Sequence, residues 1–306
     1  MSPNNSKDAY LLPALPLASW KETLATLHMW TQVVGKVRLK LCPLVNHFWN
    51  VPFYLTARGM TTSPMPYPSG MFQGTVEVSF DFIDHQLLLE TSAARMVAIA
   101  LKPQSVADFY KTFMAALADL GIEVRMWTTP CEVPEPIPFE KDQIHSAYDA
   151  AAVHQFWRIT LWVDQVLKEF RAGFLGKVSP VHFFWGSFDL AVTRFSGRRA
   201  PERPGADAIT REAYSHEVSS SGFWPGGGDI TGPAFYSYAA PEPPGFAQSP
   251  VRPKAAYYHL QMKEFLLMYD DVRTAADPKA MLMEFLESTY ESAAEAGNWD
   301  RRALER

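Results

Sequence analysis

Cysteine is scarce in this sequence, which contains only Cys42 and Cys131 among 306 residues. Two cysteines are too few for a disulfide framework or a thiolate zinc site. We therefore expect reduced cysteines in a cytoplasmic protein. An excess of positive charge is also missing, because the net charge is −5 and the isoelectric point is about 5.9. A nucleic-acid partner is disfavoured, since contacts with phosphates require a basic face.

Long apolar runs and known catalytic motifs are missing as well. No stretch approaches the roughly 20 apolar residues that span a bilayer, so a membrane partner is disfavoured. Residues 1–16 contain no basic segment followed by an apolar one, and we expect no signal peptide. The sequence has no G-x-S-x-G elbow, no H-E-x-x-H or C-x-x-C spacing, and no Walker loop.

Apolar and aromatic residues are abundant, at 47% and 13% of the chain. Apolar residues at helical spacing predict helices over 17–41, 105–121, 149–174 and 277–297. Ser19, Ser105, Asp149 and Asp277 are the expected caps. Alternation or continuous apolar runs predict strands over 48–60, 181–195, 213–224 and 233–240, and a hairpin over 72–91 with its tip at Asp84-His85. The order of these elements predicts an α+β fold with mainly antiparallel sheets and helices on one face of each sheet.

The elements fall into two similar halves, 1–127 and 149–306, joined by a proline-rich connector over 128–148. Phe48-Trp49 precedes Arg58 by the same spacing as Phe184-Trp185 precedes Arg194. Together with the shared element order, this favours an internal duplication, and chance identity is the alternative. The second half has the longer loops, where functional residues are more often found.

Four long blocks resemble a family of uncharacterised bacterial proteins of about 300 residues. They are "LHMWTQVVGKVRL", "NHFWNVPFYLTARGMTTSP", "SPVHFFWGSFDLAVTRFSGRRAP" and "YSHEVSSSGFWPGGG". The similarity extends over essentially the whole chain. It implies a single unit of unknown function, and it provides no catalytic residues to transfer.

A carboxylate within an apolar run is the main candidate for chemistry. Asp189 lies in "VHFFWGSFDLAVTRF", where an unpaired charge would be costly to bury. In a strand, Asp189 shares a small, polar face with Thr193, whereas Leu190 and Arg194 lie on the opposite face. Two interpretations stay open: a metal ligand or general base that faces a cavity, and a hydrogen-bonded group that stabilises the core.

His182 and His216 are the other candidate acid–base groups. With Asp189 they would form a His/His/carboxylate set of the kind that binds a divalent metal such as zinc or iron. No metal-binding spacing supports this set, and a structural role for either histidine is the alternative. The candidate substrate-binding residues are Arg194, Arg198, Tyr214, Trp224 and Trp185.

The sequence thus leaves two functions open, with the oligomeric state undetermined. One is an enzyme that acts on a small anionic or aromatic molecule, by acid–base or metal-assisted chemistry, in a cavity between the halves. The arginines after the 181–195 run would orient that substrate. The other is a non-catalytic protein that binds a small ligand, or acts as a scaffold, through the same aromatic residues.

Overall fold

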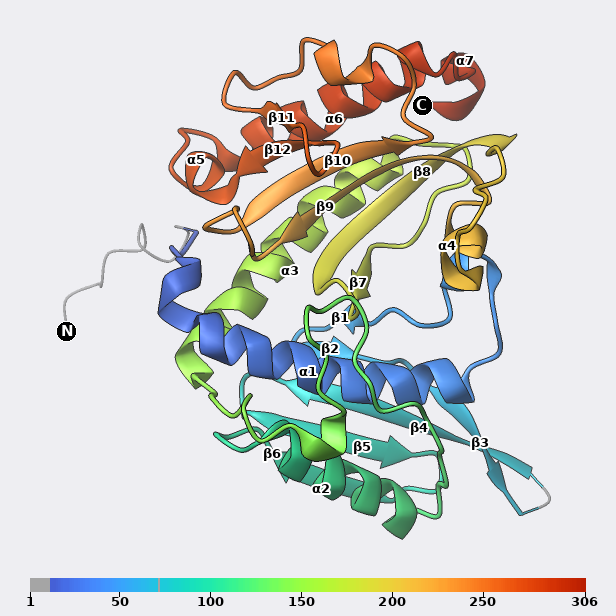
Figure 1. Ribbon diagram of the computed structural model, residues 1–306, viewed down its shortest axis with the longest axis vertical. Helices are drawn as coiled ribbons and strands as arrows, with labels where there is room; N and C mark the ends of the chain where they lie inside the picture. Colours follow the sequence, from blue (N-terminus) through green and yellow to red (C-terminus); the bar gives the residue numbers. More distant parts are fainter. Residues whose placement is uncertain (1–11, 71) are drawn as a thin grey trace, which may run out of the picture.

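The computed structural model of the protein describes residues 12–70 and 72–306. The segment 1–11, which contributes to the expectation that no signal peptide is present, lies outside the described residues. Two antiparallel sheets, each of six strands, form the framework, and helices pack against both (Figure 1). The predicted α+β class is confirmed. No described helix has the combination of length and apolar character needed to cross a membrane.

The first sheet and its helices come from the first half of the chain. Its strands pair in the order β1-β2-β4-β5-β6, and β3 also pairs with β4. The elements are α1 (Leu17–Leu41), the 3-10 turn η2 (Asn46–Phe48), β1 (Tyr54–Leu55), β2 (Gly59–Thr61), β3 (Met65–Ser69), β4 (Phe72–Asp81), β5 (Gln86–Thr91), β6 (Met96–Ala100) and α2 (Val106–Asp119).

The second sheet comes from the second half, after a connector that contains only the short turn η3 (Phe139–Lys141). Its strands pair in the order β11-β12-β10-β9-β8-β7. The elements are α3 (Ala150–Ala172), β7 (His182–Phe184), β8 (Asp189–Arg199), α4 (Ala208–Ala213), β9 (His216–Trp224), β10 (Ala234–Ala240), η4 (Phe246–Gln248), β11 (Tyr257–His259), β12 (Glu264–Met268), α5 (Tyr269–Arg273), α6 (Pro278–Ala296) and α7 (Arg301–Leu304).

The two halves share one plan, in which two neighbouring helices cover a sheet. In the first half α1 packs against α2, and in the second half α3 packs against α6 and the sheet (Figure 1). The halves join where Phe53 and Phe183 exchange backbone hydrogen bonds of 2.8 and 2.9 Å. Helices α1 and α3 also contact each other. The arrangement is consistent with two similar halves.

Three of the four predicted helix caps are confirmed. Ser105, Asp149 and Asp277 each accept a hydrogen bond from a backbone N–H in the first turn of the adjoining helix. Ser19 does not cap α1, because the helix begins at Leu17 and the Ser19 hydroxyl donates back to the carbonyl of Pro16. A residue inside the first turn no longer has the extended backbone that a cap requires.

The prediction of one strand over 181–195 is wrong. The chain forms β7, turns over residues 185–188, and returns as β8, so that Phe184 pairs with Asp189. Phe188 takes a positive φ of 58° in this turn, a conformation that is uncommon for a side-chain-bearing residue. The alternation from Asp189 onward still holds, because it lies within β8. The turn leaves Asp189 at the beginning of β8, an interior strand between β9 and the edge strand β7.

Candidate functional site

A cavity of about 540 Å³ lies on the face of the second sheet that is turned away from α3 and α6. Its lining comes from β8, β9 and β10, from the turn that precedes β8, from α4, from the η2 region of the first half, and from the connector. The aromatic residues that line it are Phe48, Trp49, Phe184, Trp185, Phe195, Tyr214, Tyr236 and Tyr238. They are eight of the 24 lining residues. A concave space that combines aromatic rings with polar groups has the features of a small-molecule site.

Asp189 is the most buried acidic group in this lining, with 7% of the residue exposed. The hydroxyls of Ser187 and Tyr236 both donate hydrogen bonds to its carboxylate. Burial raises the pKa of the Asp189 carboxyl, and these two hydrogen bonds partly offset that effect. The group is thus fixed in place and titrates closer to neutrality than an ordinary aspartate.

Gly222 in β9 allows Tyr236 to reach Asp189. A Cβ atom at Gly222 would lie 2.4 Å from the Tyr236 hydroxyl oxygen and 2.3 Å from the carbonyl oxygen of Leu190. Tyr236 pairs with Gly222 across β9 and β10, and Gly222 pairs with Ala191 across β8 and β9. The glycine therefore leaves the space through which a side chain from one flanking strand contacts a residue of the other.

The connector contributes a second carboxyl group, from Glu132. Gln32 of α1 holds the preceding residue: its Oε1 accepts from the Cys131 N–H at 2.9 Å, and its Nε2 donates to the Cys131 carbonyl at 2.8 Å. The Glu132 carboxyl then lies against Gly186, where a Cβ atom would come within 2.6 Å of Oε1. Desolvation and the charge of Asp189 raise the pKa of Glu132.

A third carboxyl, Glu264, lies next to this acidic end of the cavity. It is on β12, on the same face of the sheet as Tyr236, because Tyr236 pairs with Leu266 and side chains alternate. Burial, with the charge of Asp189, raises the pKa of Glu264 from 4.5 to about 7. Repulsion between nearby carboxylates without a positive partner favours their protonated forms.

The other end of the cavity contains His47. Its Nδ1 lies 3.2 Å from the carbonyl oxygens of Glu212 and Ala213, which fits a protonated Nδ1, and its Nε2 lies 2.6 Å from the Lys177 ammonium. Burial, and then the charge of Lys177, lower the pKa of His47. The imidazole is therefore neutral and accepts a hydrogen bond from the lysine.

The three residues expected to bind a metal are not brought together. His216 and Asp189 lie at opposite ends of the sheet, because Arg199 pairs with His216 ten residues after Asp189. At 3.3 Å per residue this separation is roughly 30 Å. Within residues 12–70 and 72–306, no three His, Cys, Asp or Glu side chains are grouped as metal ligands. The expected set fails because the residues lie at different points along their strands.

His182 is fully buried beside the cavity and is not part of its lining. Its Nε2 lies 3.4 Å from the Tyr54 hydroxyl, and its Nδ1 has no partner among the described residues. Burial, with the charges of Arg38 and Arg171, lowers the pKa of His182 to about 3. The side chain is neutral at physiological pH and makes no hydrogen bond to Asp189.

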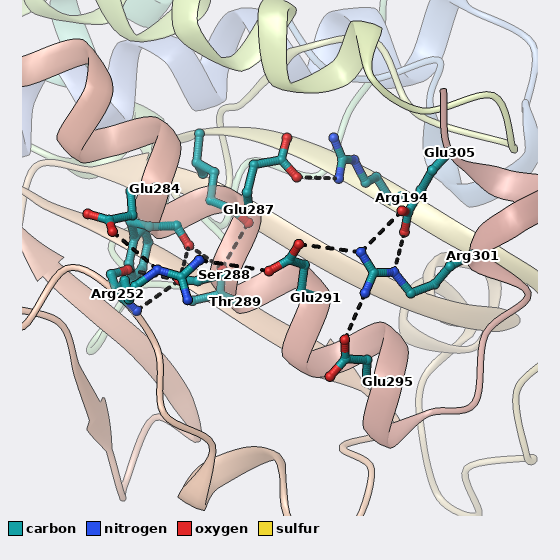
Figure 2. Close-up of polar contacts among 12 residues, drawn as sticks. Arg194, Arg252, Glu284, Glu287, Ser288, Thr289, Glu291, Glu295, Arg301 and Glu305 are labelled. Atoms are coloured by element: carbon teal, nitrogen blue, oxygen red, sulfur yellow. Dashed lines mark hydrogen bonds and ion pairs between the residues drawn. The ribbon is translucent and has the colours of Figure 1, made fainter.

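Arg194 was expected to bind substrate, and the structure places it on the opposite face of β8. It donates to the carbonyl of Phe170 and lies 3.4 Å from the centre of the Phe170 ring. An ion pair of 3.4 Å joins it to Glu287 of α6 (Figure 2). The alternation of the strand turns Arg194 toward the helices, where it joins β8 to α3 and α6.

The other predicted binding residues divide into two groups. Tyr214 and Trp185 line the cavity; the Trp185 indole N–H donates to the Val51 carbonyl at 2.9 Å. Arg198 and Trp224 do not line it. Arg198 pairs with Glu217 at 2.7 Å and bonds to backbone carbonyls after α6. Trp224 packs in a small cluster with Ile230 beyond the cavity.

Comparison with known proteins places the chain in a family. The model of the family of unknown function DUF5996 matches residues 12–306. The chain belongs to this family. The match extends over nearly the whole sequence, which confirms the resemblance that the four sequence blocks indicated. No curated protein and no solved structure matches the chain.

In this DUF5996 member, sequence reasoning missed Glu132, Tyr236 and Ser187. A usable signal existed for Tyr236, since "AFYSYAA" alternates and places Tyr236 and Tyr238 on one face. Glu132 had no such signal, because it occurs in a segment interpreted as a linker and is positioned by Gln32, 99 residues away at its Cys131 contact. Ser187 required knowledge of the turn between β7 and β8.

Proposed function

We propose that the protein is an enzyme that acts on a small aromatic molecule in this cavity, with Asp189 as the general acid–base group. The observation that carries the proposal is the Asp189 carboxyl, buried and held by two hydroxyls at the wall of an aromatic cavity. A carboxyl with a raised pKa is suited to exchange protons near neutral pH. Tyr236 and Ser187 fix its orientation toward the bound molecule.

The acid–base chemistry expected from the sequence is part of this function, whereas the expected role of the arginines in orienting the substrate is not. Arg194 and Arg198 are engaged elsewhere, and the charged groups in the described cavity lining are Glu132, Asp189 and Asp207, with His47 as the only basic side chain. Proton transfer is assigned to Asp189, because both ring nitrogens of His47 are engaged, with the carbonyls of Glu212 and Ala213 and with Lys177.

A non-catalytic ligand-binding protein is the second candidate, favoured by the large aromatic share of the lining. The Tyr236 and Tyr238 rings stack with centres 6.1 Å apart, and the Tyr214 hydroxyl hydrogen-bonds that of Tyr238 at 3.0 Å. A rigid aromatic wall binds flat molecules without chemistry. The two candidates differ in whether the bound molecule is converted.

Turnover decides between them. The purified protein, Asp189→Asn and the control Glu284→Gln, on the outer side of α6, are each incubated with the small-molecule fraction of a cell extract. Mass spectrometry then tracks all components over time. We expect a component that wild type and Glu284→Gln convert and that Asp189→Asn, folded by circular dichroism, leaves unchanged. Binding without conversion would support the second candidate, and conversion by folded Asp189→Asn would remove Asp189 from the chemistry.

A further inference from the structure

We propose that the molecule bound in this cavity carries a protonated amine beside its aromatic ring, and that the amine lies between the carboxyl groups of Glu132 and Asp189. The inference rests on the proposed function, since it names the substrate class of the same site. Three independent features carry it: the signs of the charges in the lining, the unpartnered state of Glu132, and the aromatic wall.

The charges that line the cavity are nearly all negative. Glu132, Asp189 and Asp207 contribute carboxyl groups, and no lysine or arginine is present among the described lining residues. The ammonium of Lys177 lies 4.9 Å from the Phe195 ring centre at the other end, and that of Lys36 donates to the Thr129 carbonyl of the connector at 2.6 Å. Phe195 is six residues from Asp189, roughly 20 Å along β8. An anionic ligand at the Asp189 end would therefore meet only like charges among the described lining residues.

Glu132 is placed as a ligand-binding group would be. In the part of the chain that the structure describes, its carboxyl group has no hydrogen-bond donor and no ion-pair partner, whereas Asp189 has two donors. The backbone at Glu132 adopts a positive φ of 56°, which is uncommon for a non-glycine residue. Gln32 holds Cys131 from both sides and so supports this conformation. The structure thus holds Glu132 at the wall of the cavity, with a solvent-exposed carboxyl group that no side chain of the described residues neutralises.

The mutual effect of the carboxyl groups supports the same conclusion. Desolvation is the largest cause of the raised pKa values of Glu132 and Glu264, and the charge of Asp189 is the second cause. A bound cation would remove this repulsion and would favour the ionised carboxylates. The rings of Trp185 and Tyr236 in the same lining provide apolar surface for its aromatic part, and aromatic ring faces attract cations.

Three small probes of similar shape and different charge test the inference by isothermal titration calorimetry. They are 2-phenylethylamine, 2-phenylethanol and 3-phenylpropanoate. We expect wild type to bind the amine at least about tenfold more tightly than the alcohol, equivalent to about 1.4 kcal/mol, and the propanoate most weakly. Glu132→Gln should lose most of this preference and keep its affinity for the alcohol. Glu140→Gln, an exposed residue of the same connector, should behave as wild type.

Each other result overturns the inference in a distinct way. Equal affinity for the amine and the alcohol would show an aromatic site without charge selection, and the proposed function would stand. Tightest binding of the propanoate would indicate that the site prefers an anionic substrate. If none of the three probes bound, a ring with an ammonium group would not be sufficient for binding in this cavity. The proposed function would then be decided separately, by turnover in the extract.

Discussion

The hydroxyl of Tyr236 donates a hydrogen bond to the carboxylate of Asp189, although 47 residues separate the two in the sequence. Tyr236 is on β10 and Asp189 is on β8, with β9 between them. The contact crosses a whole strand, and it exists because the intervening position is Gly222. This relationship makes the acidic end of the cavity sensitive to one methyl group.

Gly222→Ala should therefore displace Tyr236 and disturb Asp189. Part of the clash is with the Leu190 backbone carbonyl, which cannot rotate away, so we expect a loss of about 2 kcal/mol in the free energy of unfolding. Activity should fall as well. The control is Gly232→Ala, where a Cβ atom meets nothing within 4 Å. Urea denaturation measures both variants, and equal stability of the two would contradict the packing described.

Stability should decline as the pH rises from 4.5 to about 7, and Glu264 should be a main cause. Its pKa is raised from 4.5 to about 7 on folding, so the folded state holds the proton more tightly than the unfolded state over this range. The stabilisation is complete below pH 4.5 and is lost as the pH rises through about 7. Glu264→Gln, which stays neutral, should flatten this part of the profile.

The profile is measured as the melting temperature between pH 4 and pH 8. Glu90→Gln, on β5 of the other sheet, is the matched control and should keep the wild-type slope. The slope due to Glu264 is at most about 1.4 kcal/mol per pH unit, and solvent screening reduces it. A Glu264→Gln profile that overlies the wild-type profile would show that this carboxyl does not titrate differently on folding.

Arg194→Ala should be strongly destabilising, with a cost of about 3 kcal/mol. The side chain is 2% exposed and fills the space between the rings of Phe170 and Tyr290. Arg194→Lys should recover only part of this loss, because an ammonium group lacks the planar surface that stacks on the rings. Guanidinium chloride denaturation measures the effect.

Arg252 provides the comparison, since it also pairs with α6 but is exposed (Figure 2). Its ion pair with Glu284 measures 3.2 Å, and Arg252→Ala should cost less than about 1 kcal/mol. If the two alanine variants lost similar stability, the distinction between a buried stacked arginine and a surface ion pair would be incorrect.

Gln32→Ala should release the connector near Cys131. The variant loses two hydrogen bonds to the backbone of Cys131, and we expect about 2 kcal/mol less stability. In a Cys42→Ser background, the rate at which Cys131 reacts with Ellman's reagent should rise about tenfold, because local opening exposes the thiol. Gln104→Ala, which removes a single exposed hydrogen bond, should leave this rate unchanged. An unchanged rate in Gln32→Ala would show that other contacts hold the segment.

The sequence by itself determined the local features of this protein. Helical periodicity and the side-chain chemistry of Ser105, Asp149 and Asp277 placed three helix starts, because a cap depends on residues within one turn. Alternation placed Asp189 and Arg194 on opposite faces of a strand, since successive side chains point in opposite directions. The abundance of apolar residues and the order of elements were sufficient for the α+β class.

Only the tertiary structure decided which of these residues share a site. His182, Asp189 and His216 are of the right types for a metal centre, but strand register separates His216 from Asp189 along the sheet. Tyr236 reaches Asp189 past Gly222, and Gln32 holds the segment that carries Glu132, so both effects act across long sequence separations. Pairing and close approach are set by how whole strands and helices pack, and such contacts leave no local pattern in the chain.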